Sequence, residues 1–176
     1  MKAVIDTNVL LVANQSHKDI SPDCVEECVR RLTMIMADGV TVIDDDFHII
    51  SEYLHKTHPN QPKGVGDVFL KWLLRNQSNR RHVEQVSITE ISENHFQEFP
   101  DPTLEAIFDA PDRKFAAVAH AHPERPPVWQ AADCKWMDWW PALKEKELSV
   151  EFLCKADARK FYQKKFPEKP LPPFPD

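Results

Sequence analysis

The sequence predicts an alternating α/β protein built on a parallel sheet. Short apolar runs alternate along the chain with longer segments whose apolar residues recur at helical spacing, which is the pattern of βαβ units. Two of the runs, Ala3–Ile5 and Val128–Gln130, lead to the aspartates Asp6 and Asp133. Parallel sheets bind ligands at the carboxyl ends of their strands, so these aspartates mark the edge where a functional site is expected.

Length, charge and cysteine content bound the class of protein. The chain has 176 residues, of which 42% are hydrophobic, and this is enough for one domain with a sizeable core. Its net charge of -6 means that any polyanion must meet a local basic patch. No CxxC pair, charged leader or membrane-length apolar run is present. We therefore expect a soluble cytoplasmic protein with free thiols at Cys24, Cys28, Cys134 and Cys154.

The first segment, Lys2–Leu11, is interpreted as a strand in which polar residues interrupt an apolar run. Ala3, Val4 and Ile5 suit a strand buried on both faces, which places Asp6 at its carboxyl end. The same residue types also build turns and cap helices. These ten residues alone leave a binding role and a capping role for Asp6 equally open.

A helix, a strand and a second helix follow. Pro22–Asp38 begins with the Ser-Pro-Asp sequence typical of a helix start, and Thr41–Ile43 is a short strand. Asp44–Asp46 are expected to cap the next helix, Phe47–His58, because negative charge suits the first turn. Glu52 lies on the border of the apolar arc of that helix, where it can point along the edge of the sheet.

The middle of the chain carries a local basic segment. A helix around Val68–Leu73 ends in a stretch without acids that contains Arg75, Arg80 and Arg81. Arginine forks match phosphate oxygens, so this stretch is a candidate nucleic-acid contact, although a solvated helix end has the same composition. Gln85–Ile88 is either a strand or an extended connection.

After the proline-punctuated, irregular stretch Phe99–Pro111, Pro111 is expected to start the next helix, which contains Asp112. Small and apolar residues lie three, four and seven positions later, so Asp112 is expected in the middle of a buried face. A carboxylate there is costly unless it is paired, hydrogen-bonded or bound to a cation. The neighbouring Arg113 and Lys114 are candidate phosphate contacts.

The chain closes with a strand, a lysine-rich helix and a proline-rich tail. These are Leu148–Cys154, Lys155–Phe166 and Pro167–Asp176. We therefore divide the chain into a principal domain, residues 1–154, and a C-terminal helix with its tail, residues 155–176. The tail should be extended or disordered unless it docks on the fold.

Four carboxylates, Asp6, Glu52, Asp112 and Asp133, are thus expected near one edge of the sheet. Carboxylates gathered at neutral pH repel one another, and a hard divalent cation relieves the repulsion. Oxygen ligands favour Mg²⁺ or Mn²⁺ over zinc, and the histidine and cysteine pairs lack the spacing of a zinc site. Such a site predicts metal-dependent hydrolysis of phosphodiesters.

Four short motifs, in order, resemble the acidic motifs of PIN-domain (PilT N-terminus) nucleases. They are Val4–Leu10, Ile49–Tyr53, Asp112–Phe115 and Ala132–Asp133. The resemblance implies a sandwich of helices about a central parallel sheet and a Mg²⁺- or Mn²⁺-dependent ribonuclease whose metal-binding acids are Asp6, Glu52, Asp112 and Asp133. It also implies that Thr7 or Asn8 steadies Asp6 through hydrogen bonds.

The same family includes the toxins of VapC-type toxin–antitoxin pairs, so the resemblance also implies an antitoxin as a candidate partner. The lysine-rich helix and tail depart from the usual small toxins. Family members often form dimers, and Trp136, Trp139 and Trp140 would serve either such an interface or the core. The residues do not distinguish RNA from DNA, and a catalytically silent binding module is the alternative to an enzyme.

Overall fold

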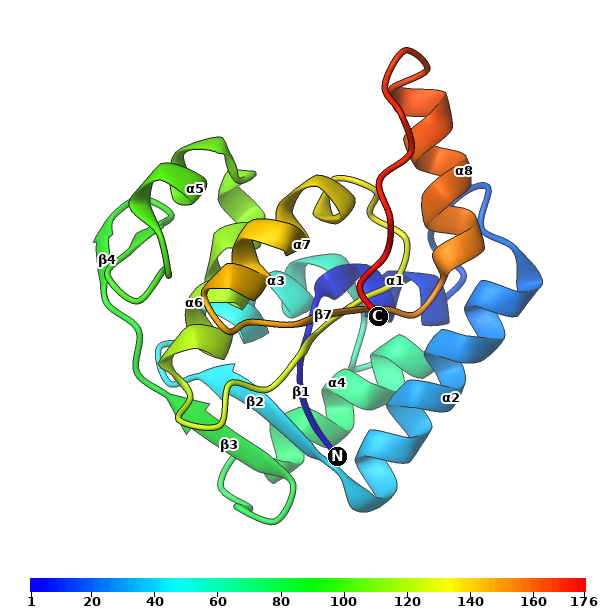
Figure 1. Cartoon of the computed structure of the whole chain (residues 1–176). Helices are drawn as coiled ribbons and strands as arrows, with labels where there is room; N and C mark the ends of the chain where they lie inside the picture. Colours follow the sequence, from blue (N-terminus) through cyan, green and yellow to red (C-terminus); the bar gives the residue numbers. More distant parts are fainter.

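The chain folds into a three-layer α/β/α sandwich around a parallel sheet, as the sequence predicts (Figure 1). The computed structural model describes residues 1–176. The sheet has five parallel strands in the order β3-β2-β1-β6-β7. In chain order the strands are β1 (Lys2–Ile5), β2 (Val40–Asp44), β3 (Val83–Val86), β6 (Val128–Gln130) and β7 (Val150–Phe152).

Helices cover both faces of this sheet. On one side α1, α2 and α4 pack against one another, and on the other α6 lies on the central strands and α7 against β7. The helices are α1 (Thr7–Ala13), α2 (Pro22–Asp38), α3 (His48–Lys56), α4 (Val65–Asn76), α5 (Pro102–Ile107), the 3-10 turn η1 (Ala110–Asp112), α6 (Arg113–Ala121), α7 (Trp136–Glu145) and α8 (Lys155–Lys165). None of them combines the length and the apolar character needed to cross a bilayer.

The strand order places a topological switch point between β1 and β6. From β1 the sheet grows through β2 to β3 on one side, whereas β6 and β7 extend it on the other. Val4 of β1 is in register with Val128 of β6, and Ile5 is in register with Trp129. A crevice at the carboxyl ends of the strands is expected where the direction of growth reverses, and ligands of open α/β sheets bind in that crevice.

The prediction of a strand throughout Lys2–Leu11 is wrong beyond Ile5. The strand ends there, and α1 begins at Thr7 with Asp6 as its N-cap. Val9 and Leu10 are fully buried in this short helix. A short apolar run has no periodicity that separates a buried strand from a buried helix, which is why the sequence pattern did not reveal α1.

Most other elements lie where they were predicted. Asp44 caps α3, because its carboxylate accepts hydrogen bonds from the backbone N–H groups of His48, at 2.8 Å, and Ile49, at 3.0 Å. The uncertain segment after α4 is strand β3, which begins earlier than expected. The stretch Phe99–Pro111 was wrongly expected to be irregular throughout, since it contains α5, which Asp101 caps. A small hairpin of β4 (Glu90–Ser92) and β5 (His95–Phe96) precedes it.

The C-terminal helix α8 is anchored to the rest of the fold by polar contacts. Asp157 accepts hydrogen bonds from the Ser21 hydroxyl, at 2.6 Å, and from the Ser21 N–H, at 2.8 Å. The Tyr162 hydroxyl donates to Asp138 at 2.7 Å. The helix therefore has a fixed position, with Ala158 and Tyr162 on its buried side.

The proline-rich tail docks on the body of the protein. The Trp140 indole donates to the carbonyl of Pro173 at 3.0 Å, and the Phe174 ring packs on Phe152 with 5.1 Å between centroids. The other two residues of the tryptophan cluster, Trp136 and Trp139, are buried in the core. Trp136 and Trp139 are thus core residues, and Trp140 holds the tail.

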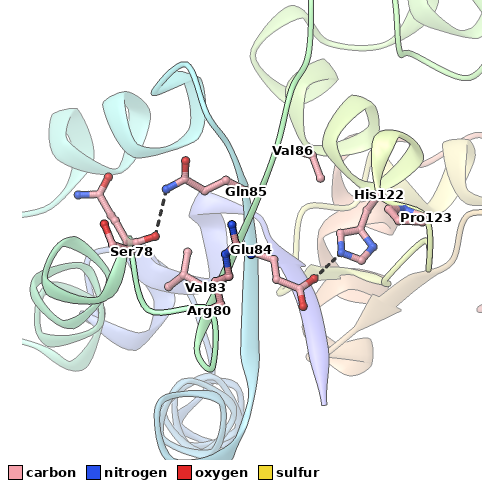
Figure 2. A pocket seen from close by; sticks show the side chains of 9 residues that line it. Ser78, Arg80, Val83, Glu84, Gln85, Val86, His122 and Pro123 are labelled. Atoms are coloured by element: carbon pink, nitrogen blue, oxygen red, sulfur yellow. Dashed lines mark hydrogen bonds and ion pairs between the residues drawn. The ribbon is translucent and has the colours of Figure 1, made fainter.

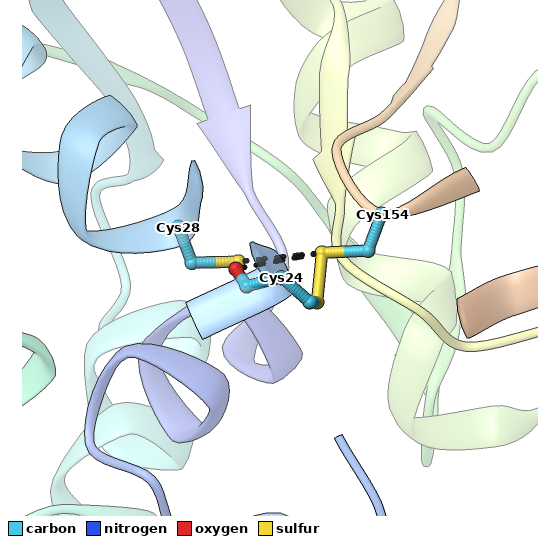
Figure 3. Close-up of side chains that lie close together, drawn as sticks. All are labelled: Cys24, Cys28 and Cys154. Carbon is cyan, nitrogen blue, oxygen red and sulfur yellow. Dashed lines mark hydrogen bonds between the residues drawn. A yellow bond between two sulfur atoms is a disulfide. The ribbon is translucent and has the colours of Figure 1, made fainter. Parts of the chain in front are cut away.

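The cysteines depart from the expectation of four free thiols. Cys24 at the start of α2 and Cys154 before α8 form a disulfide, although 130 residues separate them in the sequence (Figure 3). The Sγ of Cys28, one turn further along α2, lies 3.9 Å from the Sγ of Cys154. Spacing along the chain does not reveal this pairing, because the fold alone brings α2 beside the end of β7. Cys28 and Cys134 are buried thiols.

Candidate functional site

Asp6 lies at the switch point with one carboxylate oxygen unsatisfied. The residue is only 4% exposed. Its Oδ1 accepts a hydrogen bond from the Asn8 N–H at 2.8 Å, whereas its Oδ2 is buried without a partner. Burial, together with the negative charges of Asp112, Asp133 and Glu52, raises the pKa of Asp6 well above its usual value. A buried, unpaired carboxylate oxygen is unfavourable unless a ligand or a proton occupies that position.

Asp112 and Asp133 belong to two other segments, and their charges act on Asp6. Asp112 is half-buried at the junction of η1 and α6, and not in the middle of the buried face as expected, because the α-helix starts at Arg113, two residues later than predicted. Burial and the charges of Asp133 and Glu52 raise the pKa of Asp112 to about 7. Burial also raises the pKa of Asp133, although its Oδ1 accepts the Lys135 N–H at 3.1 Å.

Asn8 holds the two sides of the switch point together. Its Oδ1 accepts a hydrogen bond from the Ala132 N–H at 3.0 Å, so the turn after β1 is tied to the segment that carries Asp133. Its own N–H bonds Asp6, as the expected supporting role requires. The Thr7 hydroxyl instead donates to Glu52. Thr7 and Asn8 therefore orient two different acids.

Glu52 is already engaged by a lysine. The Lys114 ammonium lies 3.1 Å from Glu52 Oε1 and also donates to the carbonyl of Pro111. Only 8% of the Lys114 side chain is exposed, so its charge is committed to Glu52 and is not free for a phosphate. Arg113 donates to the carbonyls of Phe108, at 3.2 Å, and Asn94, at 3.1 Å. It joins the hairpin to the end of α5.

The four acids lie near one edge of the sheet, but their carboxylate oxygens do not converge on a single ion position. Each of the other three contributes to the raised pKa of Asp6, so their charges act on a shared region. Ligand atoms of three residues approach within 4.8 Å of one another in only two places, Cys24/Cys28/Cys154 and Glu84/His122/Glu124, and neither includes one of the four acids. The Glu52 carboxylate is instead held by Thr7 and Lys114.

The donor set fits a hard divalent ion at Asp6, Asp112 and Asp133. All three offer carboxylate oxygens, Asp6 Oδ2 has no other partner, and burial is the largest cause of the raised pKa of each of the three. A cavity of about 420 Å³ lies at Glu52 and Lys114, and its other lining residues are Asp46, Phe47, His48, Ser51, His55 and Asn94, so none of the three aspartates lines it.

The metal-free protein is expected to lose stability as the pH rises from about 4 to 7. In that range the folded protein keeps the proton of Asp112, whose pKa is about 7, while the unfolded chain has lost it. The free energy of unfolding therefore falls with pH. Each pH unit between the two pKa values is worth about 1.4 kcal/mol, and solvent screening of half-buried Asp112 reduces the expected total to about 2 kcal/mol. Melting curves in chelator, at pH 5 and pH 8, test this.

The matched control for this pH dependence is Asp112→Asn, which should make the profile less steep, while the raised pKa values of Asp6 and Asp133 leave a remaining dependence of the same sign. Mn²⁺ should restore stability to the unmodified protein at pH 8, because it replaces the lost proton as the compensating charge. Equal pH profiles for the protein and for Asp112→Asn would contradict the assignment of Asp112 to the acidic edge.

The expected basic patch lies at the opposite end of the sheet. Arg75, Arg80 and Arg81 are exposed, in and after the last turn of α4 and before the start of β3. Because the strands are parallel, this is the amino edge, whereas Asp6 and Asp133 follow the carboxyl ends of β1 and β6. These arginines therefore do not lie beside the acids.

A larger cavity, of about 650 Å³, runs along the edge strand β3, and Arg80, Glu84 and His122 are among its lining residues (Figure 2). Figure 2 shows Glu84 of β3 pointing to His122, whose Nε2 it contacts. The Lys2 ammonium binds Glu84, at 3.0 Å, and Glu124. A cation already occupies the centre of this acidic group, so it offers no metal site.

The sequence interpretation missed two residues that shape the acidic edge. One is Lys114, as the partner of Glu52. The other is Tyr53, whose buried hydroxyl donates to the carbonyl of Ile5 at the end of β1 and so fixes α3 to that strand. Burial, followed by the charge of Asp6, raises the pKa of Tyr53. A lysine inside an otherwise small and apolar helix face was the one local signal available for Lys114.

Comparisons of the chain with protein-family models, with curated proteins and with solved structures found no match.

Proposed function

We propose that the chain is a Mg²⁺- or Mn²⁺-dependent phosphodiester hydrolase that cleaves RNA. Asp6, Asp112 and Asp133 are its metal-binding acids, and Glu52, which Thr7 and Lys114 hold, is the fourth acid of the site. The observation that carries the proposal is the buried, unpartnered Oδ2 of Asp6 at the switch point, among three further carboxylates. The resemblance of the four acidic motifs to those of PIN-domain nucleases supports the same assignment.

The residues around the site position the acids. Asn8 fixes Asp6 relative to the segment that carries Asp133, and Thr7 orients Glu52. Lys114 balances the charge of Glu52. The chemistry that a bound divalent ion supplies is activation of water and stabilisation of the charge on the phosphodiester.

A second candidate is a silent nucleic-acid or protein-binding module with the same fold. The ion pair between Lys114 and Glu52 favours it, since a lysine that neutralises one acid lowers the demand for a metal. An antitoxin-like inhibitory protein is a partner for the nuclease and not for the silent module, because it would inhibit cleavage by covering the acidic edge.

Cleavage of an end-labelled single-stranded RNA in Mn²⁺, in Mg²⁺ and in chelator separates the two candidates. The nuclease proposal expects internal cleavage with either ion and none in chelator. A DNA of the same sequence, tested in parallel, shows whether the sugar is read. Mn²⁺ binding is measured separately by calorimetry. Absence of both cleavage and metal binding in the folded protein would favour the silent module.

A further inference from the structure

Helix α8 and the turn after it form a basic segment on an acidic protein. Six cationic side chains lie between residues 155 and 169, with only two acids, in a chain of net charge -6. The cations are Lys155, Arg159, Lys160, Lys164, Lys165 and Lys169, and all are exposed. One of the two acids, Asp157, is buried against Ser21 and does not contribute to the outer surface.

The fold places this segment at the same edge as the acids. α8 follows β7 almost directly, so it rises from the carboxyl edge of the sheet, and Figure 1 shows it projecting beyond that edge at the upper right. The charge of Lys165 lowers the pKa of Asp133 against the larger effect of burial, so Lys165 is close enough to act on the acidic site.

Three exposed lysines of α8 have no acidic partner. Lys160, Lys164 and Lys165 form no salt bridge in the structure, and Lys160 donates only to the backbone carbonyl of Asp19 at 2.9 Å. Because Ala158 and Tyr162 anchor the helix, the lysines are presented on a rigid element. Their charges are therefore available to an external anion.

Aromatic rings alternate with these cations. The Lys160 ammonium lies 5.0 Å from the centre of the half-buried Phe161 ring, which packs against His17 at 5.7 Å. Phe166 lies between Lys165, at 5.7 Å, and Lys169, at 4.5 Å. Lysines that track a phosphate chain, together with rings on which bases stack, characterise surfaces that bind single-stranded nucleic acid.

We propose that α8 is the wall along which single-stranded RNA reaches the acidic edge. Lys160, Lys164 and Lys165 contact its phosphates, and unpaired bases stack on Phe161 and Phe166. The ligand class rests on the proposed function, whereas the surface itself rests on the charge and placement of α8. This assignment replaces the arginines of the amino edge, which lie at the wrong end of the sheet.

The test measures binding of a fluorescein-labelled single-stranded RNA of about 16 nucleotides by fluorescence anisotropy. Chelator is present, so that no cleavage occurs. The variant is K160Q/K164Q/K165Q, and the matched control is R75Q/R80Q/R81Q, which removes the same charge at the opposite edge. We expect about a tenfold loss of affinity for the α8 variant and little change for the control. Each phosphate contact to a single strand contributes roughly 0.7 to the slope of log affinity against log salt. The magnitude of this slope should therefore decrease by about 2 when the three lysine contacts are removed.

Phe161→Leu tests stacking, and melting curves show whether each variant is folded. Loss of one stacked base should lower the affinity of the folded variant about fivefold or more. Equal loss of affinity in both triple variants, tighter binding of a duplex of the same sequence, or no RNA binding by the unmodified protein would overturn the proposal.

These outcomes are distinguishable from failure of the proposed function. RNA that binds through α8 in chelator but is never cleaved in Mn²⁺ supports the α8 wall and contradicts the nuclease. Cleavage by a protein whose affinity is insensitive to K160Q/K164Q/K165Q supports the nuclease and contradicts the α8 wall.

Discussion

Asp6→Asn is expected to abolish RNA cleavage and, at the same time, to make the metal-free protein more stable. Loss of a single outer hydrogen-bond partner of a metal site typically costs about 10–100-fold. Loss of an acid that binds the ion directly should cost more, so we expect a decrease of at least about 100-fold in the cleavage rate and a weaker affinity for Mn²⁺.

The gain in stability follows from the surroundings of Asp6. Its Oδ2 is buried without a partner, and three nearby acids repel its charge. Asparagine removes the charge and still accepts the Asn8 N–H as the cap of α1, because asparagine and aspartate are similarly good N-caps. Each kcal/mol gained should raise Tm by about 2–4 °C for a chain of this size.

Asp44→Asn is the matched control, because Asp44 is also a buried aspartate at the carboxyl end of a strand. Its oxygens are satisfied by the N–H groups of Asp46, His48 and Ile49. We expect this variant to lose about 1 kcal/mol of stability, as for a weakened helix cap, and to keep cleavage. Melting curves in chelator and cleavage rates in Mn²⁺ measure both effects. A destabilised but active Asp6→Asn would show that Asp6 is a structural cap and not a ligand.

The parts of this site that the sequence predicts are those that follow from local patterns. Apolar runs locate β1, β2 and β6, and the parallel arrangement then places Asp6 and Asp133 at one edge without any knowledge of contacts. The cap formed by Asp44 is equally local, since the residue and its partners lie within five positions.

Contacts between distant segments were not predictable in this way. Lys114 and Glu52 are 62 positions apart in the sequence and form an ion pair in the fold. This pair engages a lysine that was expected to contact phosphate and a glutamate that was expected to bind a metal. The basic segment at Arg75–Arg81 was recognised from composition, but composition does not say to which end of the sheet it belongs. The sequence shows the lysines of α8 as a departure from small toxins. It does not show their distance from the acids, because that distance depends on the whole fold.

Cys154→Ser is expected to lower the free energy of unfolding by about 3 kcal/mol in oxidising buffer, because the disulfide closes a long loop in the unfolded chain. Cys24→Ser should cost less. It leaves Cys28 on the same helix, with its Sγ 3.9 Å from that of Cys154, so a replacement bridge between α2 and Cys154 can form as the variant oxidises. Burial raises the pKa of the Cys28 thiol to about 12, which keeps it protonated and unreactive toward the existing disulfide.

Peptide mapping of the unreduced Cys24→Ser protein should identify a Cys28–Cys154 link, and the double variant Cys24→Ser/Cys28→Ser should be as unstable as Cys154→Ser. If Cys154→Ser melts at the same temperature as the unmodified protein, without reductant, the bridge contributes nothing to stability. In that case the attachment of α8 depends on Asp157 and Tyr162 alone, and the lysines of α8 keep their position in a reducing compartment as well.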